Sequence, residues 1–135
     1  MEGPMSRLCP CSSKLTFDKC CEPYLTGRKQ PETPEKLMRS RFTAYSVKRA
    51  DYLIATTAAE ERTKLDLDEL RVYCKTISCI SLKVIKTGAG GPTDEEGTVL
   101  FHASLQVNGK RILHRELSRF KREDGRWMYV DGETN

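Results

Sequence analysis

The chain has 135 residues, of which 38% are hydrophobic and 31% are charged. A chain of this length forms one ordinary domain with at most a small appendage, and its hydrophobic content suffices for a buried core. No apolar run approaches the roughly 18 residues that a spanning helix needs, so we expect no membrane protein of that kind. The net charge of +4 is compatible with an anionic partner but does not require one.

The N-terminal residues bear on the redox state of the six cysteines. The sequence MEGPMSR lacks the apolar stretch of a secretory signal. We therefore expect a cytoplasmic protein in a reducing compartment, where structural disulfides are uncommon.

Four of the six cysteines lie within the stretch CPCSSKLTFDKCC. Cys9 and Cys11 form one close pair, and Cys20 and Cys21 form a second pair after eight intervening residues. Two close pairs joined by a short loop suit one tetrahedral ion, and zinc in closed structural sites takes four thiolates of this kind. Iron is the alternative metal for the same ligands. A redox dithiol system and a secreted disulfide pair are the alternatives to a metal site.

The same stretch resembles the SEC-C motif, whose usual form reads C-P-C-G-S-G-K followed by C-C or C-H. In that family the four cysteine positions bind zinc, and the resemblance carries this role to Cys9, Cys11, Cys20 and Cys21. The present sequence has Ser12 and Ser13-Lys14 where the motif has its two glycines and the serine between them. Proteins that end in a SEC-C segment use it to contact chaperones or ribosomes, so the resemblance implies a protein or ribonucleoprotein partner.

Helical patterns follow a polar linker. Thr33 is a suitable N-cap, Pro34 suits the first helical position, and the segment LMRSRFTAYSV that follows is amphipathic. A second short helix is expected over DYLIATT, with Asp51 as its cap. A third is expected over LDLDELRVYCK, where Asp66 begins a capping-box-like start.

From residue 77 the hydrophobic period changes to two. Strands are predicted over ISLKVIK, TVLFHASLQV, RILHRELSRFK and RWMYV. Asn108-Gly109 and Asp124-Gly125 are strong signals for two-residue hairpins. Helices followed by an antiparallel meander indicate an α+β fold, with one face of the sheet packed on the first helix.

The segments LMRSRFTAY, ADYLIATT, ELSRF and GRWMYVDG make the chain similar to the YchJ-like family of uncharacterised proteins. The similarity spans residues 9 to 132. It implies a SEC-C-like zinc segment and linker over residues 1–30, and a cone-shaped, nuclear-transport-factor-two-like or cystatin-like domain over residues 31–135. In such a domain a curved antiparallel sheet packs around helices.

The hairpins predict a polar row on the apolar face of the sheet. A two-residue loop at Asn108-Gly109 places Ala103 opposite His114, and Phe101 opposite Glu116. Cross-strand partners share a face of a sheet, so Ser118 joins the same row. The second hairpin, with the same kind of loop, adds Tyr129 and Asp131 to this face.

A carboxylate buried on an apolar face must be paired, protonated or open to water. We expect Glu116 to form an ion pair with Arg39 or Arg41 of the first helix, as a brace between helix and sheet. The alternative is a ligand pocket on the concave face, with the residues Arg39, Arg41, Tyr45, His114, Glu116 and Ser118 on its wall. A slipped register would turn the row outward.

These patterns support three functions. The first is a zinc-binding, noncatalytic adaptor for a protein or ribosome-associated partner. The second is a small-molecule binder or an enzyme, with Glu116 as general base and His114 or Tyr45 as helper. The third and weakest is nucleic-acid binding through the basic residues Arg115, Arg119, Lys121, Arg122 and Arg126. The noncatalytic adaptor is the preferred hypothesis.

Overall fold

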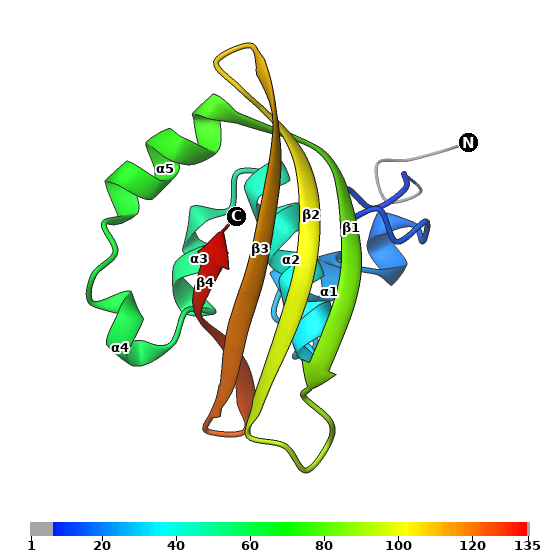
Figure 1. Ribbon diagram of the computed structural model, residues 1–135, viewed down its shortest axis with the longest axis vertical. Coiled ribbons are helices and arrows are strands. Elements are labelled where there is room, and N and C mark those ends of the chain that lie inside the picture. The colour runs from blue at the N-terminus through cyan, green and yellow to red at the C-terminus, as the bar shows by residue number, and fades with distance from the viewer. Residues whose placement is uncertain (1–6, 135) are drawn as a thin grey trace.

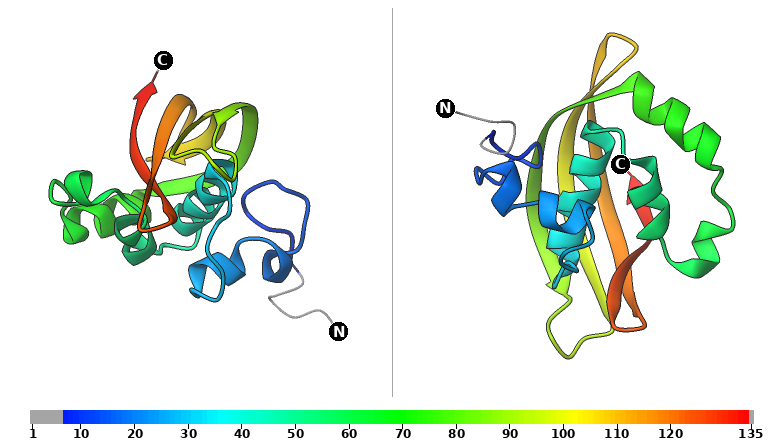
Figure 2. Two further views of the ribbon diagram at one scale, coloured as in Figure 1. Left: turned by 90° about the horizontal axis from the view of Figure 1, so that it is seen from below. Right: turned by 180° about the vertical axis from the view of Figure 1, so that it is seen from behind.

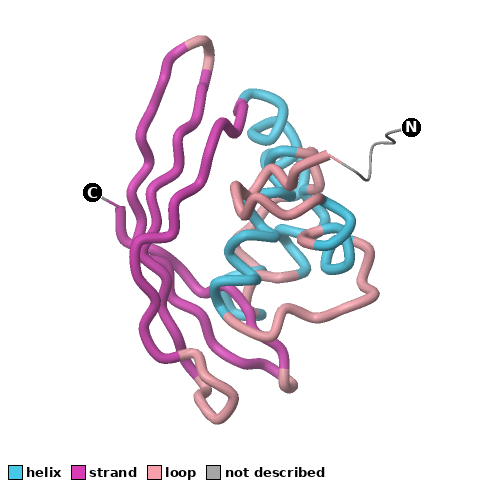
Figure 3. The backbone as a smooth tube through the Cα atoms, turned by 90° about the vertical axis from the view of Figure 1, so that its right-hand side faces the viewer, coloured by secondary structure: helices cyan, strands magenta, loops and turns pink. Residues whose placement is uncertain are grey.

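The computed structural model describes residues 7–134, and its architecture is α+β. An antiparallel sheet in the order β1-β2-β3-β4 curls around the helices, which all lie on its concave side (Figures 1 and 3). The elements are the 3₁₀ helix η2 (Phe17–Lys19), the helices α1 (Glu22–Leu25), α2 (Pro34–Ser46), α3 (Ala50–Ala55), α4 (Ala59–Arg62) and α5 (Leu67–Thr76), and the strands β1 (Ile77–Ala89), β2 (Glu96–Val107), β3 (Lys110–Glu123) and β4 (Arg126–Thr134).

Helix α2 begins where the sequence predicts. The Thr33 hydroxyl accepts a hydrogen bond from the backbone N–H of Lys36 at 3.1 Å, and Pro34 occupies the first helical position. Leu37 and Phe42 on this helix are buried in one hydrophobic core with side chains of β2, β3 and β4. The prediction that the sheet wraps around the first helix is therefore confirmed.

The next two predicted helices also form, but only one has the predicted cap. Asp66 accepts a hydrogen bond from the backbone N–H of Glu69 at 3.1 Å and caps α5, as expected. The prediction that Asp51 caps α3 is wrong. Arg49 is the N-cap residue, and Asp51 lies in the first turn, where its carboxylate accepts hydrogen bonds from the Arg49 guanidinium. The carboxylate then still lies near the positive end of the helix.

Both hairpin predictions are confirmed. Asn108 and Gly109 have φ of 52° and 81°, and Asp124 and Gly125 have φ of 52° and 80°, which two-residue loops of type I′ require. Between β2 and β3 the register is as predicted along the whole pair, from Val107 opposite Lys110 to Glu96 opposite Lys121. The polar row of β3 therefore lies on the concave face.

One register prediction is wrong. Phe120 lies opposite Tyr129 as expected, but a bulge follows at Val130, so that Arg119 pairs with Asp131 and Ser118 with Gly132. The extra residue turns Asp131 to the outer face, where its carboxylate accepts two hydrogen bonds from Arg119, at 2.6 and 2.7 Å. Asp131 is therefore not part of the concave polar row.

The N-terminal segment lies beside α2, on the side away from α5 (Figure 2). Three of its cysteines, Cys9, Cys11 and Cys21, are buried in the same hydrophobic cluster as Leu37 and Phe42. The cluster thus extends from the sheet through α2 to the cysteine segment. Within residues 7–134, no helix is long and apolar enough to cross a membrane.

Candidate metal centre and concave pocket

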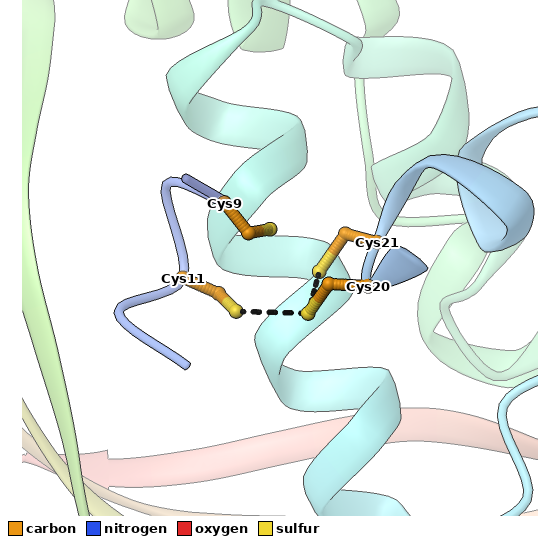
Figure 4. Close-up of side chains that lie close together, drawn as sticks. All are labelled: Cys9, Cys11, Cys20 and Cys21. Atoms are coloured by element: carbon orange, nitrogen blue, oxygen red, sulfur yellow. Dashed lines mark hydrogen bonds between the residues drawn. The ribbon is translucent and has the colours of Figure 1, made fainter. Parts of the chain in front are cut away.

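The four N-terminal cysteines converge on one point (Figure 4). Their Sγ atoms all lie within 4.8 Å of one another, with 3.5 Å between Cys11 and Cys20 and 3.9 Å between Cys20 and Cys21. All four are free thiols. Four thiolates around zinc at about 2.3 Å have sulfur atoms about 3.8 Å apart. The spacing therefore fits a single tetrahedral ion, and these residues could hold a metal.

A short loop positions the first two thiols. Cys9 and Cys11 lie in a loop that is closed by a hydrogen bond from the Cys9 N–H to the Leu15 carbonyl oxygen, at 2.8 Å. Within this loop, Ser12 and Lys14 have φ of 67° and 73°, in the left-handed region that favours glycine. These are the positions at which the usual SEC-C motif has its glycines. The loop thus has the left-handed conformation that glycines in the usual motif favour, although this chain has no glycine at either position.

The cysteine loop is attached to the body of the protein by three polar contacts. The Cys9 Sγ lies 3.6 Å from the Thr43 hydroxyl of α2. Arg39 of α2 donates a hydrogen bond to the Cys11 carbonyl oxygen at 2.9 Å, and the Leu82 N–H of β1 donates one to the Ser12 hydroxyl at 3.0 Å. Arg39, expected on the pocket wall, therefore lies at the cysteine cluster instead, where its positive charge also favours thiolates.

The thiols influence one another because they are so close. Hydrogen bonds from Cys21 and Cys9 lower the pKa of Cys11, whereas burial raises the pKa of Cys20 to about 12. The hydrogen bond to Cys11 also raises the pKa of Cys21. Four thiolates cannot coexist in so small a volume without a cation, and a divalent ion would supply the missing positive charge.

A second candidate site lies on the concave face of the sheet, between α2, the end of α5 and the strands. It is a cavity of about 210 Å³. Its walls are formed by aromatic, aliphatic and polar side chains: Met38, Arg41, Phe42, Tyr45, Tyr73, Ile77, Cys79, Phe101, Ala103, Leu105, His114, Glu116, Ser118, Phe120 and Tyr129. Of the six residues that the sequence suggested for a pocket, all except Arg39 line this cavity.

Glu116 is held by its neighbours on the sheet. One carboxylate oxygen lies 2.9 Å from the Nε2 of His114, and the other accepts hydrogen bonds from Ser118 at 2.6 Å and Tyr129 at 2.9 Å. Burial opposes ionisation, but these hydrogen bonds outweigh it and keep the pKa of Glu116 below its usual value. Glu116 is therefore a carboxylate at neutral pH, and its lowered pKa makes it a weak general base.

The predicted brace between Glu116 and an arginine of α2 is wrong. Arg41 is 9% exposed, and its Nη1 donates hydrogen bonds to the Leu53 carbonyl oxygen at 2.8 Å and to the hydroxyls of Thr56 and Thr57 at 2.7 and 3.3 Å. Its guanidinium carbon lies 4.4 Å from the ring centre of Tyr129. Burial lowers the pKa of Arg41, but a guanidinium stays charged in proteins.

Gly132 makes room for the Glu116 carboxylate. It lies opposite Ser118 in the register, and a Cβ atom at position 132 would overlap the side chain of Glu116. The bulge at Val130 brings this glycine to the polar row, where the uninterrupted register would have placed Asp131.

Sequence reasoning placed Tyr129 on the concave face but omitted it from the site. The Tyr129 hydroxyl donates a hydrogen bond to Glu116. The hairpin register was the sequence signal that could have added Tyr129 to the site. Tyr73 and Cys79 were missed for a different reason, because the packing of α5 and β1 against the cavity leaves no periodic pattern. Burial raises the pKa of Cys79 to about 11, so this thiol stays protonated at neutral pH.

The basic residues considered for nucleic-acid binding are partly engaged by the protein itself. Arg119 forms an ion pair with Asp131, and Lys121 forms one with Glu123 at 3.5 Å. Arg122 donates to the carbonyl oxygen of Asp94 and packs over the ring of Trp127, 4.3 Å from its centre. Arg119 and Lys121 are therefore paired with acidic groups, and Arg122 lies on the face of its strand partner Trp127 rather than in a cationic strip on the outer face.

Comparisons with known proteins agree with the fold and the cysteine motif. The family model described as "YchJ, middle NTF2-like domain" matches residues 33–132. A UPF0225 protein of Geobacter sulfurreducens is 38% identical over 128 residues, covering 95% of this chain and 80% of the relative. A UPF0225 protein of Actinobacillus succinogenes is 37% identical, covering 94% and 82%.

Two solved structures are similar over nearly the whole chain. The solution structure of a SEC-C motif containing protein from Rhodopseudomonas palustris has a TM-score of 0.86 and 36% identity, covering 94% of this chain and 98% of that one. The crystal structure of a SEC-C motif containing protein from Psychrobacter arcticus has a TM-score of 0.83 at 23% identity, covering 98% and 85%, and supports the fold. The chain thus belongs to the YchJ-like, UPF0225 family, whose NTF2-like domain here follows a SEC-C cysteine motif.

Proposed function

We propose that the protein binds a small molecule in the concave pocket, and that zinc at the four cysteines fixes the N-terminal segment against the wall of that domain. The observation that carries the proposal is the Glu116 carboxylate, which is oriented by three hydrogen bonds on the wall of a largely apolar cavity. Polar groups converging in an apolar concavity are the usual features of a ligand site. The proposed role is binding, because Glu116 is ionised and its lowered pKa makes it a weak general base.

Filling the cavity tests this proposal. Ala103 is 2% exposed and lines the pocket, so Ala103→Leu places extra atoms inside the cavity. A screen of small fragments by ligand-observed NMR should find binders of the metal-loaded wild type that lose binding in this variant. Leu113→Ala on the outer face of β3 is the control and should bind them all. Fragments that bind Ala103→Leu as well as they bind Leu113→Ala would contradict ligand binding in the pocket. An absence of binders to the wild type would contradict it too.

Zinc is the proposed metal because of the donor set and its burial. Four thiolates supplied by the protein leave no position open for a substrate, as in closed structural zinc sites. Elemental analysis of protein purified under reducing conditions should find one zinc per chain. Stoichiometric iron in the same preparation would contradict the assignment.

A second candidate function, a noncatalytic adaptor, is favoured by the surface of the cysteine segment. Leu8 is 67% exposed and Leu15 is 54% exposed, and both flank the metal centre. We propose that this segment, residues 1–30, contacts a protein or ribonucleoprotein partner in the cytoplasm, while residues 31–135 fold as the second unit. Pull-down with the Leu8→Ser/Leu15→Ser variant tests this without touching the thiols.

The expected result is loss of specific partners from the double variant and from Cys9→Ser, with both variants keeping a folded α+β domain. Partners retained by both variants would contradict the adaptor function. Ribosomal components that remain bound at high salt in the wild type only would identify a ribonucleoprotein partner.

A further inference from the structure

Arg41 is a buried cation whose charge is met by neutral groups. Its three hydrogen-bond acceptors are a backbone carbonyl oxygen and two hydroxyls, and all three contact the same nitrogen, Nη1. Among residues 7–134, no carboxylate forms an ion pair with Arg41. Burial of a charge without an opposite charge is energetically unfavourable. The guanidinium lines the cavity, so an anionic group in that cavity would supply the missing partner.

The cavity also contains a fixed negative charge. Glu116 lines the same wall, and its electrostatic attraction contributes to the environment of Arg41 without a direct contact. Tyr129 lies between the two charges: its ring face contacts Arg41, and its hydroxyl donates to Glu116. The two charges of the pocket are thus one tyrosine side chain apart.

A simple anion does not suit this arrangement. A carboxylate at Arg41 would gain a partner, but Glu116 would repel it across a medium of low dielectric constant. An ammonium group alone would be attracted by Glu116 but repelled by Arg41. A molecule with both groups on the same or adjacent carbon atoms satisfies both charges and leaves the pocket neutral.

We propose that the ligand of this pocket is a small apolar zwitterion of the α-amino acid class, with its carboxylate at Arg41 and its ammonium group at Glu116. The inference rests on the proposed small-molecule function and specifies its ligand. The cavity of about 210 Å³ is large enough for a small amino acid. Phe101, Leu105 and Phe120 supply an apolar surface for the side chain.

Three compounds with the same isobutyl group separate the two charges. L-leucine carries both groups, 4-methylpentanoate carries only the carboxylate, and 3-methylbutylamine carries only the ammonium group. Isothermal titration of the metal-loaded protein should show leucine binding about tenfold tighter than either analogue, because each analogue leaves one charge of the pocket without its charge-assisted contact. Equal binding of leucine and 4-methylpentanoate would overturn the proposal.

Two substitutions test the assignment of each charge. Glu116→Gln keeps the shape of the side chain, and it should weaken leucine and strengthen 4-methylpentanoate, so that the tenfold preference disappears. Arg41→Met should abolish binding of leucine and of 4-methylpentanoate. If this variant does not fold, the opposite effects of Glu116→Gln on these two ligands still test the proposal. Arg115→Met on the outer face is the control and should leave all three affinities unchanged.

The outcomes for ligand class and pocket are distinguishable. If fragments bind the wild type and not Ala103→Leu, but leucine has no advantage over its analogues, the pocket stands and the zwitterion is wrong. If neither leucine nor any fragment responds to Ala103→Leu, the small-molecule function itself is wrong. An unchanged leucine preference in Glu116→Gln would also contradict the zwitterion.

Discussion

The cysteine segment and the concave pocket are stabilised in different ways. Between Arg7 and Cys21 the chain has few apolar side chains, and Leu8 and Leu15 among them are exposed, so we expect its order to depend on a cation held by the four thiols. The pocket is built on β2, β3 and α2, whose buried side chains form the core. On its wall, His114, Ser118 and Tyr129 hold the Glu116 carboxylate. The comparison teaches that a segment with little core of its own needs another source of order, such as a bound metal. A pocket, in contrast, is held open by the core around it.

Removal of the metal should affect the cysteine segment and not the pocket, and it is the largest effect that we expect. Cys11→Ser should lose the bound ion, which contributes about 10–16 kcal/mol in isolated zinc-finger peptides. Hydrogen exchange followed by mass spectrometry should then show fast exchange over residues 7–21 and unchanged protection of β2 and β3. Cys74→Ala is the control, because this buried cysteine lies outside the cluster. Equal loss of protection in the strands would mean that the metal stabilises the whole core.

Displacement of Glu116 should damage the pocket without affecting the metal. Gly132→Ala introduces a Cβ that overlaps the Glu116 side chain, so the carboxylate loses its three hydrogen bonds. We expect a loss of about 2 kcal/mol in the free energy of unfolding and about tenfold in ligand affinity. Urea unfolding and calorimetry measure the two effects. The neighbouring Glu133→Ala, at an exposed site, should change neither.

The two regions also differed in how far the sequence predicted them. The cysteine site is local, because four ligands within thirteen positions need only one loop to meet. The polar row of the pocket required the hairpin register, which Asn108-Gly109 determined correctly over the whole β2–β3 pair. The bulge at Val130 has no signal in the hydrophobic pattern, so Asp131 was placed on the wrong face. The expected arginine brace failed because Tyr129, Ser118 and His114 already supply the donors of Glu116.

The pH dependence of stability should report on Glu116. Its pKa is lowered in the folded protein, so the ionised side chain stabilises the fold above its usual pKa of about 4.3. This contribution is lost as the pH falls through the acid range. Urea unfolding at about pH 7 and about pH 4 should therefore show a smaller loss on acidification in Glu116→Gln than in the wild type. An equal loss in the two proteins would mean that other carboxylates account for it.

The smallest expected effects concern the loop around the cysteines. Lys14 is exposed and in the left-handed region, so Lys14→Gly should relieve strain and stabilise the metal-loaded protein by about 1 kcal/mol. Ser12→Gly relieves similar strain but removes the acceptor of the Leu82 N–H, so its net gain should be smaller. Thermal unfolding of both variants measures the difference. A larger gain for Ser12→Gly would show that its contact with β1 contributes nothing.

A high-resolution crystal structure of the wild-type protein, purified in reducing buffer and soaked with L-leucine, tests the central claim most directly. The account predicts one ion bound by Cys9, Cys11, Cys20 and Cys21 at about 2.3 Å from each sulfur. It also predicts density for the amino acid between Arg41 and Glu116. Disulfides in place of the ion, or a concave face closed by side chains with no space for a ligand, would contradict it.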